Sequence, residues 1–160
     1  MEDDTEKVLH RCAAQVLCHP EGDDVDWFPL DKIAISVFDG WLGPKNYHLL
    51  DCKDDAERED RNRRMLSFWM KIYDSYEVLC RVNDCEFERE TNRLKYESSC
   101  AYDGNRPGNR FQCILIPELT AIYHENWDDT NVLWYSNRND IEPLISMAIE
   151  SGLYSIEYAR

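Results

Sequence analysis

Four residues near the N-terminus have side chains of the types that bind zinc. They lie within HRCAAQVLCH and are His10, Cys12, Cys18 and His19. If this segment is a helix with about 100° per residue, Cys12 lies about 200° from His10 around the axis and Cys18 about 80° from it. Structural zinc sites instead pair their ligands about two to four residues apart across a turn. We therefore expect the two cysteines to pack as small residues, and we predict no bound metal or cofactor.

The other cysteines raise two further possibilities, a second zinc site and a catalytic thiol. Cys80 and Cys85 have a spacing at the edge of zinc usage, and Cys100 and Cys113 follow without a nearby partner. Burial as small apolar side chains is the simpler interpretation. A cysteine–histidine nucleophile stays open as an alternative because seven cysteines and four histidines are present. However, no phosphate-binding loop, dinucleotide fingerprint, nucleophile elbow or H-E-x-x-H sequence accompanies them.

Carboxylates are abundant in polar runs and are the other candidate for acid–base or metal chemistry. The runs contain Asp23, Asp24, Asp26, Asp54, Asp55, Asp128 and Asp129. A catalytic pair needs one carboxyl with a raised pKa in a dry cleft, whereas such runs are usually solvated. A metal-dependent nuclease is disfavoured because an acidic chain repels a polyanionic substrate. A small hydrolase with a cysteine or carboxylate site is therefore the alternative function and not the first.

Three predicted loops place tryptophan beside acidic residues, which is typical of a protein-binding surface. Trp69 and Trp134 lie on periodic apolar faces and are expected in the core, but Trp127 lies among polar residues, where exposure and folding back on the sheet are equally compatible. Tryptophan is enriched at interface hot spots, and acidic neighbours steer a basic partner. We predict partner contacts at His124, Glu125, Trp127, Asp128, Asp129, Asp26, Trp27, Asp39 and Trp41.

Length and charge limit the classes of function. The chain has 160 residues, which fits a single domain over residues 1–160 with a core of its own. Its formal net charge is −14, from 18 basic and 32 acidic residues. Residues 1–31 carry nine acidic and two basic side chains, which is half of that surplus. Such a charge disfavours nucleic acid and anionic membranes as partners and favours a basic protein, or simply high solubility.

The ends and apolar runs of the chain indicate a cytoplasmic protein. The acidic start MEDDTEKVL lacks the basic region of a signal peptide, and no apolar run approaches the roughly 18 residues of a membrane span. The cysteine count is odd and no compact disulfide framework is apparent, so we expect reduced thiols.

Apolar spacing predicts the elements of the first two thirds of the chain. The longest is a helix over Asp54–Tyr76 with a mixed-charge first half expected in water and a second half, around Trp69, expected on the sheet. Between Asn83 and Tyr102 the pattern favours a strand only weakly. The other predicted elements are a helix over Glu6–His19, a strand over Lys32–Phe38, a strand over Tyr76–Val82 and a loop over Tyr102–Arg110.

The last third predicts a hairpin, a helix and a final strand. Phe111–Ile116 and Thr120–Tyr123 are predicted as strand, broken or bulged at Pro117 and therefore at an edge or kinked there. Asn131–Tyr135 is the predicted partner strand across the connection HENWDD. A helix over Ile141–Ile149 starts at Asn139 or Asp140 and stops at Gly152, before a strand over Leu153–Tyr158. These elements predict an α+β fold, a single domain with a mostly antiparallel sheet packed against two or three helices.

The last third, FQCILIPELTAIYHENWDDTNVLWYSNRNDIEPLISMAIESGLYSIE, resembles the end of small bacterial proteins in the broad class of immunity proteins of toxin systems. The shared pattern is an apolar strand with a Pro-Glu-Leu step, an acidic-aromatic hairpin, an aliphatic-aromatic strand, a helix and a terminal strand. It covers about a third of the chain and assigns no catalytic residues. The resemblance implies a small acidic inhibitor that occludes a cognate, basic toxin domain. A structural adaptor is the third option.

Overall fold

The computed structural model describes residues 4–18, 28–52, 54–83, 86–101 and 111–158. The predicted loop Tyr102–Arg110 and the predicted contact residues Asp26 and Trp27 lie outside these ranges. Within the described ranges, no helix has both the length and the apolar content needed to cross a membrane.

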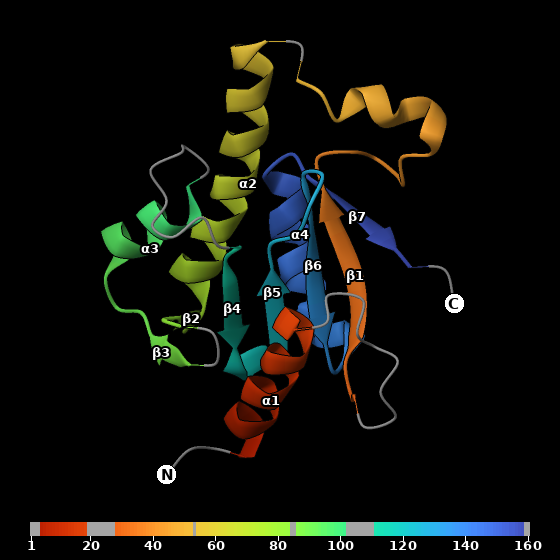
Figure 1. The fold of residues 1–160 in the computed structure, drawn as a ribbon. Coiled ribbons are helices and arrows are strands. Elements are labelled where there is room, and N and C mark those ends of the chain that lie inside the picture. The colour runs from red at the N-terminus through yellow and green to blue at the C-terminus, as the bar shows by residue number, and fades with distance from the viewer. Residues whose placement is uncertain (1–3, 19–27, 53, 84–85, 102–110, 159–160) are drawn as a thin grey trace.

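A seven-stranded sheet organises the molecule, and every pair of neighbouring strands in it is antiparallel (Figure 1). The strand order is β3-β2-β4-β5-β6-β1-β7. The strands are β1 (Asp31–Ser36), β2 (Leu79–Arg81), β3 (Phe87–Arg89), β4 (Cys113–Ile116), β5 (Ala121–His124), β6 (Thr130–Tyr135) and β7 (Tyr154–Glu157). The predicted α+β class with a mostly antiparallel sheet is thus confirmed.

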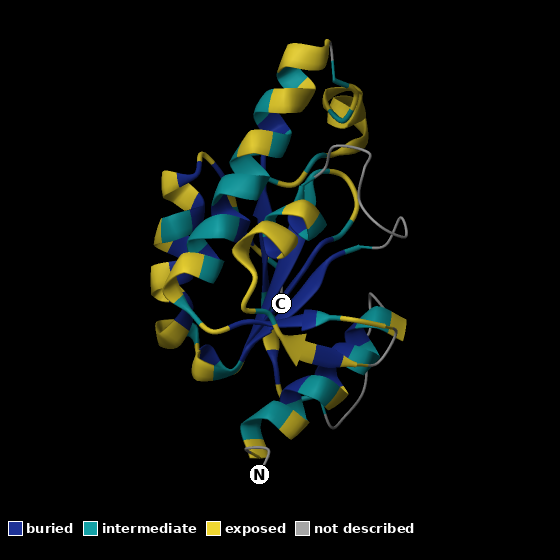
Figure 2. Ribbon diagram, turned by 90° about the vertical axis from the view of Figure 1, so that its left-hand side faces the viewer, coloured by how far each residue is buried: buried dark blue, intermediate teal, exposed yellow. Residues whose placement is uncertain are grey.

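Helices cover both faces of this sheet. In the described residues they are α1 (Asp4–Cys18), α2 (Asp55–Ser75), α3 (Arg93–Cys100) and α4 (Glu142–Glu150), with the short 3₁₀ helices η1 (Pro44–Leu49), η3 (Pro117–Leu119) and η4 (Arg138–Ile141). Helix α1 packs on one face, and the other three α-helices pack on the opposite face (Figure 1). Figure 2 shows the resulting three layers, with a buried sheet between helices whose outer sides are exposed.

Strand β4 shows how the two faces share the apolar residues. Ile114 and Ile116 pack in the cluster that contains Trp69 of α2, whereas Cys113 and Leu115 pack in the cluster on the α1 face. Because successive side chains of a strand point to opposite faces, a strand covered on both sides is apolar at every position. All four residues of β4 are buried accordingly.

Pro117 is where the chain reverses. The predicted strand stretches Phe111–Ile116 and Thr120–Tyr123 do contain β4 and β5, but the prediction that Pro117 breaks or bulges one strand at an edge or kink was wrong. Pro117–Leu119 form η3, Thr120 adopts the left-handed conformation with φ of 47°, and β5 returns antiparallel to β4 with Ile114 opposite Tyr123. The proline ends a strand in the middle of the sheet, because β4 pairs with β2 on its other side.

The region from Asn83 to Tyr102 also differs from its prediction, since it contributes the short strand β3 and the helix α3. Asn92 caps α3 by accepting a hydrogen bond from Lys95 N at 3.1 Å. The hydroxyl of Tyr96 donates to Trp69 O of α2 at 3.0 Å. A cap and a tertiary hydrogen bond thus stabilise a helix of 8 residues that has little apolar periodicity.

The last helix begins and ends at defined signals. Asn137, and not Asn139 or Asp140 as predicted, supplies the cap by accepting from Asn139 N at 3.1 Å, at the start of η4. Gly152 adopts φ of 82° after α4, as predicted for a terminal glycine, and Leu153 N then donates to Ala148 O at 3.0 Å.

Replacing Gly152 by alanine should lower the free energy of unfolding by about 1–2 kcal/mol, because a left-handed residue with a Cβ is strained. The added Cβ would also meet Arg64 Cδ at 2.8 Å and disturb the bond from Arg64 to Gly152 O. Urea unfolding measures the change. Gly40→Ala is the matched control, since nothing lies within 4 Å of its Cβ, and equal stability of G152A and G40A would contradict the strain.

Candidate functional site

The connection between β5 and β6, residues 125–129 (here the hairpin tip), is a fixed turn. Asp128 and Asp129 both have positive φ, 63° and 51°. Aspartate tolerates this region better than most residues because its short polar side chain hydrogen-bonds locally. Thr130 N donates to Trp127 O at 3.2 Å and Trp127 N to Asn126 Oδ1 at 2.9 Å. The two aspartates are therefore suited to the left-handed backbone of the turn, and they have a structural role there in addition to their charge.

Arg61 holds the hairpin tip against the rest of the molecule. Arg61 is 4% exposed, and its guanidinium donates to Asp129 Oδ2 at 3.0 Å and to Glu57 Oε1 at 2.8 Å. It also donates to the backbone oxygens of Leu49 at 2.7 Å and Leu50 at 3.2 Å. Burial opposes the charge, but the bonds to Asp129 and Glu57 outweigh it and raise the pKa of Arg61. One side chain thus joins α2, the end of η1 and the turn.

The position of Arg61 corrects the expectation that the first half of α2 lies in water. That half does extend past the end of the sheet in Figure 1, but Arg61 within it is buried. Arg61 lies four residues before Met65, on the helical stripe that continues to Trp69. This continuity was a signal in the sequence that the search for site residues missed. The carboxylate of Asp129, a predicted contact residue, is consequently engaged inside the fold.

His124 and Glu125, two further predicted contact residues, are buried at the base of the turn. His124 is 4% exposed, and burial, with Arg81 nearby, lowers its pKa to about 4. Glu125 Oε2 accepts from Gln112 N at 2.8 Å, and Glu125 N donates to Gln112 O at 2.8 Å. These bonds extend the β4–β5 ladder by one step, so both residues have structural roles.

Trp127 and Asp128 are the predicted residues that the turn presents to solvent. Trp127 is 71% exposed, and its ring meets Phe111 edge to face at 4.7 Å. Asp128 is exposed beside it. Arg61 and backbone hydrogen bonds hold this turn in place. The tip therefore presents one large aromatic ring and one carboxylate in fixed positions.

Asp39 and Trp41 lie on the loop after β1. Val37 N donates to Asp129 O at 3.2 Å, so this loop starts beside the hairpin tip, and Asp39 is exposed on it. Trp41 is 52% exposed, and its ring folds toward the last strand. Its Nε1 donates to Glu157 O at 3.1 Å and its ring meets Tyr158 at 4.9 Å. Trp41 therefore contacts β7, whereas Trp127 contacts Phe111.

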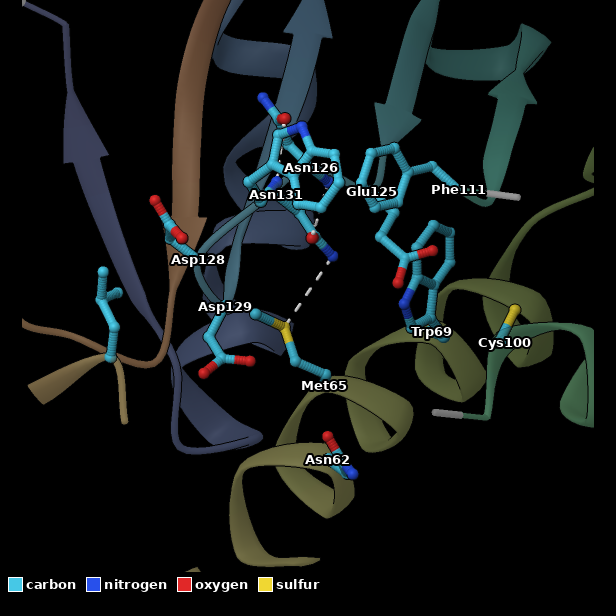
Figure 3. A pocket seen from close by; sticks show the side chains of 12 residues that line it. Asn62, Met65, Trp69, Cys100, Phe111, Glu125, Asn126, Asp128, Asp129 and Asn131 are labelled. Carbon is cyan, nitrogen blue, oxygen red and sulfur yellow. Dashed lines mark hydrogen bonds between the residues drawn. The ribbon is translucent and has the colours of Figure 1, made fainter. Parts of the chain in front are cut away.

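A pocket of about 220 Å³ lies between the hairpin tip and α2. In Figure 3 Asp129 of the tip and Asn131 of β6 face Asn62 and Met65 of α2 across it. Asn131 Nδ2 donates to Tyr123 OH at 2.8 Å and approaches Met65 Sδ at 3.8 Å. The rest of the wall is Leu50, Trp69, Cys100, Phe111, Glu125, Asn126, Trp127 and Asp128. Sequence reasoning did not foresee a contribution from α2 or Phe111.

Burial holds three cysteines as thiols. It raises the pKa of Cys12 to about 11, opposed in part by Arg11, and that of Cys113 to about 12. It also raises the pKa of Cys80. Cys113 faces His124 across the β4–β5 pair, but burial disfavours both the thiolate and the imidazolium. A nucleophilic cysteine needs the opposite environment.

His10 and Cys12, two of the residues considered for zinc, are used for packing, whereas Cys18 is exposed and His19 and Cys85 lie outside the described residues. His10 meets the ring of Phe87 at 5.5 Å, and Cys12 is fully buried under the sheet. Across the described ranges, no three His, Cys, Asp or Glu side chains are grouped so that they could hold a metal ion.

Searches against protein-family models, curated proteins and solved structures found no match to this chain.

Arg61→Ala should lower the free energy of unfolding by about 2–4 kcal/mol, because it leaves the carbonyls of Leu49 and Leu50 and the Asp129 carboxylate without their donor. Chemical denaturation measures this. Arg58→Ala is the matched control: Arg58 lies on the same helix in an exposed pair with Asp55 at 3.2 Å, which contributes at most about 1 kcal/mol. A loss no larger than that of R58A would contradict the proposed role of Arg61.

His124 should make the protein less stable in acid. Its folded pKa of about 4 lies below the ordinary 6.5, so the unfolded state binds the proton more tightly and stability falls as the pH drops from 6.5 toward 4. His124→Phe removes this contribution. The stability of the wild type relative to H124F should therefore fall by up to about 3 kcal/mol across that window, measured by urea unfolding at several pH values. A pH-independent difference would contradict the buried neutral state.

Proposed function

We propose that this chain is a non-enzymatic binding protein for a basic protein partner, and specifically an immunity protein that neutralises a cognate toxin domain by occluding its active or substrate-binding surface. The observation that carries the proposal is the hairpin tip, where Trp127 is 71% exposed on a turn fixed by Arg61. Exposure of a large aromatic ring without a partner is unfavourable in water, and such rings are the commonest hot spots of interfaces.

The fixed geometry of the tip supports tight binding. Ordering a loop on association costs free energy, and a preorganised loop avoids that cost. Bonds of 3.0 and 2.8 Å from Arg61 to Asp129 and Glu57 hold this turn before any partner arrives. The ring of Trp127 further rests against Phe111 at 4.7 Å. The tip therefore suits a small set of contacts that slow dissociation.

Charge supports a basic partner. The net charge is −14, and Asp128 is exposed next to the aromatic ring. An acidic surface accelerates association with a basic protein and repels nucleic acid. This chain could therefore compete with nucleic acid for the basic surface of a partner that binds nucleic acid. The resemblance of the last third of the chain to immunity proteins points the same way.

A hydrolase with a cysteine or carboxylate site is the alternative, and it has less support. Burial raises the pKa of Cys12, Cys80 and Cys113. The buried carboxylate at the pocket, Glu125, accepts a hydrogen bond from the backbone of Gln112, which ties it to the ladder between β4 and β5.

The experiment is a pull-down with the full chain from the organism that encodes it, followed by the intact mass of the complex and calorimetry with the purified partner. We expect a 1:1 complex with a basic protein whose toxicity the chain suppresses on co-expression. Trp127→Ala should weaken binding at least about 30-fold, Asp128→Asn less, and raised salt should lower the association rate.

Leu94→Ala is the matched control, because Leu94 is 74% exposed on α3 and does not line the pocket. It should bind as the wild type does. The proposal would be overturned if no basic partner were recovered, or if W127A bound the partner with the affinity of the wild type.

A further inference from the structure

We propose that the pocket between the hairpin tip and α2 receives an arginine side chain of the partner. This inference rests on the proposed function and adds the chemistry of the contact. Five observations carry it: the size of the pocket, its aromatic rings, its carboxylates, its amide side chains and its place beside the exposed Trp127.

The size of the pocket fits one long side chain. Its volume of about 220 Å³ is below the roughly 300–1,000 Å³ of typical small-molecule and cofactor sites. Its position also suits a protein ligand, because the pocket adjoins Trp127. A partner that packs on the ring of Trp127 would thus bring a neighbouring side chain to the mouth of the pocket.

Aromatic rings supply surfaces for a cation. Trp69, Phe111 and Trp127 all line the pocket. Trp127 and Phe111 meet edge to face, with an interplanar angle of 87°, so their ring faces point in different directions. Trp69 is 1% exposed and packs on Tyr123 at 4.3 Å between ring centroids, so the accessible ring surface belongs to Trp127 and, in part, to Phe111. Tryptophan is the aromatic residue that attracts cations most strongly, and the guanidinium of arginine also stacks on ring faces.

The polar residues of the wall complement a positive charge. The described residues that line the pocket include Glu125, Asp128 and Asp129 but no lysine or arginine. Asp129 binds Arg61, and Glu125 Oε2 accepts a hydrogen bond from Gln112 N. Asp128 is therefore the exposed carboxylate beside a ligand, and the buried Glu125 adds negative charge to the wall. The remaining polar side chains are the amides of Asn62, Asn126 and Asn131, whose oxygens accept hydrogen bonds. The wall therefore favours a cation with several donors over an anion.

These requirements together select arginine. A guanidinium carries five N–H donors in a plane, is always charged and is weakly hydrated, so it can lie against a ring while its edge donates to carboxylate and amide oxygens. A lysine ammonium offers one compact, strongly hydrated charge and does not stack. Arginine is also enriched among interface hot spots, together with tryptophan.

The test uses N-acetyl-arginine methylamide as the probe, with the lysine and citrulline analogues as comparators. Each is titrated into the full-length ¹⁵N-labelled protein to millimolar concentrations, and NMR follows the backbone amides of residues 125–129 and the indole N–H groups. We expect the arginine probe to shift the signals of Trp127 and the tip, but not the indole of Trp41. Citrulline, which keeps the shape without the charge, should bind about tenfold more weakly, and lysine should also bind more weakly.

Two variants test whether the arginine probe binds beside the carboxylates of the pocket. Glu125→Gln keeps an oxygen to accept from Gln112 N and removes the charge, and Asp128→Asn does the same at the exposed position. Each should weaken the arginine probe by about tenfold. Glu118→Gln is the matched control, since Glu118 is exposed on η3 at the opposite end of β5, and it should change nothing. If E125Q fails to fold, D128N still tests the arginine pocket, because the side chain of Asp128 is exposed.

The outcomes separate this inference from the proposed function. Absence of shifts at the tip, equal binding of arginine and citrulline, or unchanged binding by both E125Q and D128N would overturn the arginine pocket even if a basic partner has been found. If no basic partner is recovered, the proposed function is overturned. The probe titration does not depend on that result. With a partner in hand, replacing its contacting arginine by lysine should weaken the complex at least about tenfold.

Discussion

The fold around the hairpin tip depends on a buried positive charge. A guanidinium out of water is tolerated only when its donors find acceptors at the right positions. Arg61 therefore requires that two successive carbonyls at the end of η1, the Glu57 side chain one helical turn earlier and the Asp129 side chain of the β5–β6 turn occupy fixed places at once. The left-handed conformations of Asp128 and Asp129 belong to the same constraint, because they turn the second carboxylate inward. One side chain thus links the end of η1 and helix α2 to the distant turn between β5 and β6.

This constraint divides the tip into an inner and an outer part. In the inner part Glu125 extends the ladder of β4 and β5, next to His124 at the end of β5, which is buried as the neutral imidazole. The outer residues, Trp127 and Asp128, are presented to solvent by the same backbone. One short polar connection therefore contains both the residues that stabilise a surface and the residues that form it.

Apolar spacing was sufficient to predict α1, α2, α4 and the class of the sheet, because these elements carry their burial pattern locally. It also located β4 and β5 but treated them as one strand interrupted at Pro117, because a strand covered on both faces is apolar throughout and has no alternation to mark where it ends. It failed at α3 because that helix depends on Asn92 and on the bond from Tyr96 to α2. Exposure of Trp127 was not predictable, because it is decided by Arg61, sixty-six residues away. Arg61 itself was accessible from the sequence, on the stripe of Met65 and Trp69.

The loop after β1 has a consequence for self-association. Strand β7 is the last strand of the sheet, and an edge with unpaired backbone groups is a template on which another chain can add a strand. Trp41 donates its indole N–H to Glu157 O of this edge, and its ring covers Tyr158. Because that carbonyl already has a donor and a bulky ring lies beside it, an incoming strand would first have to displace Trp41. The half-exposed tryptophan therefore opposes edge-to-edge aggregation at β7.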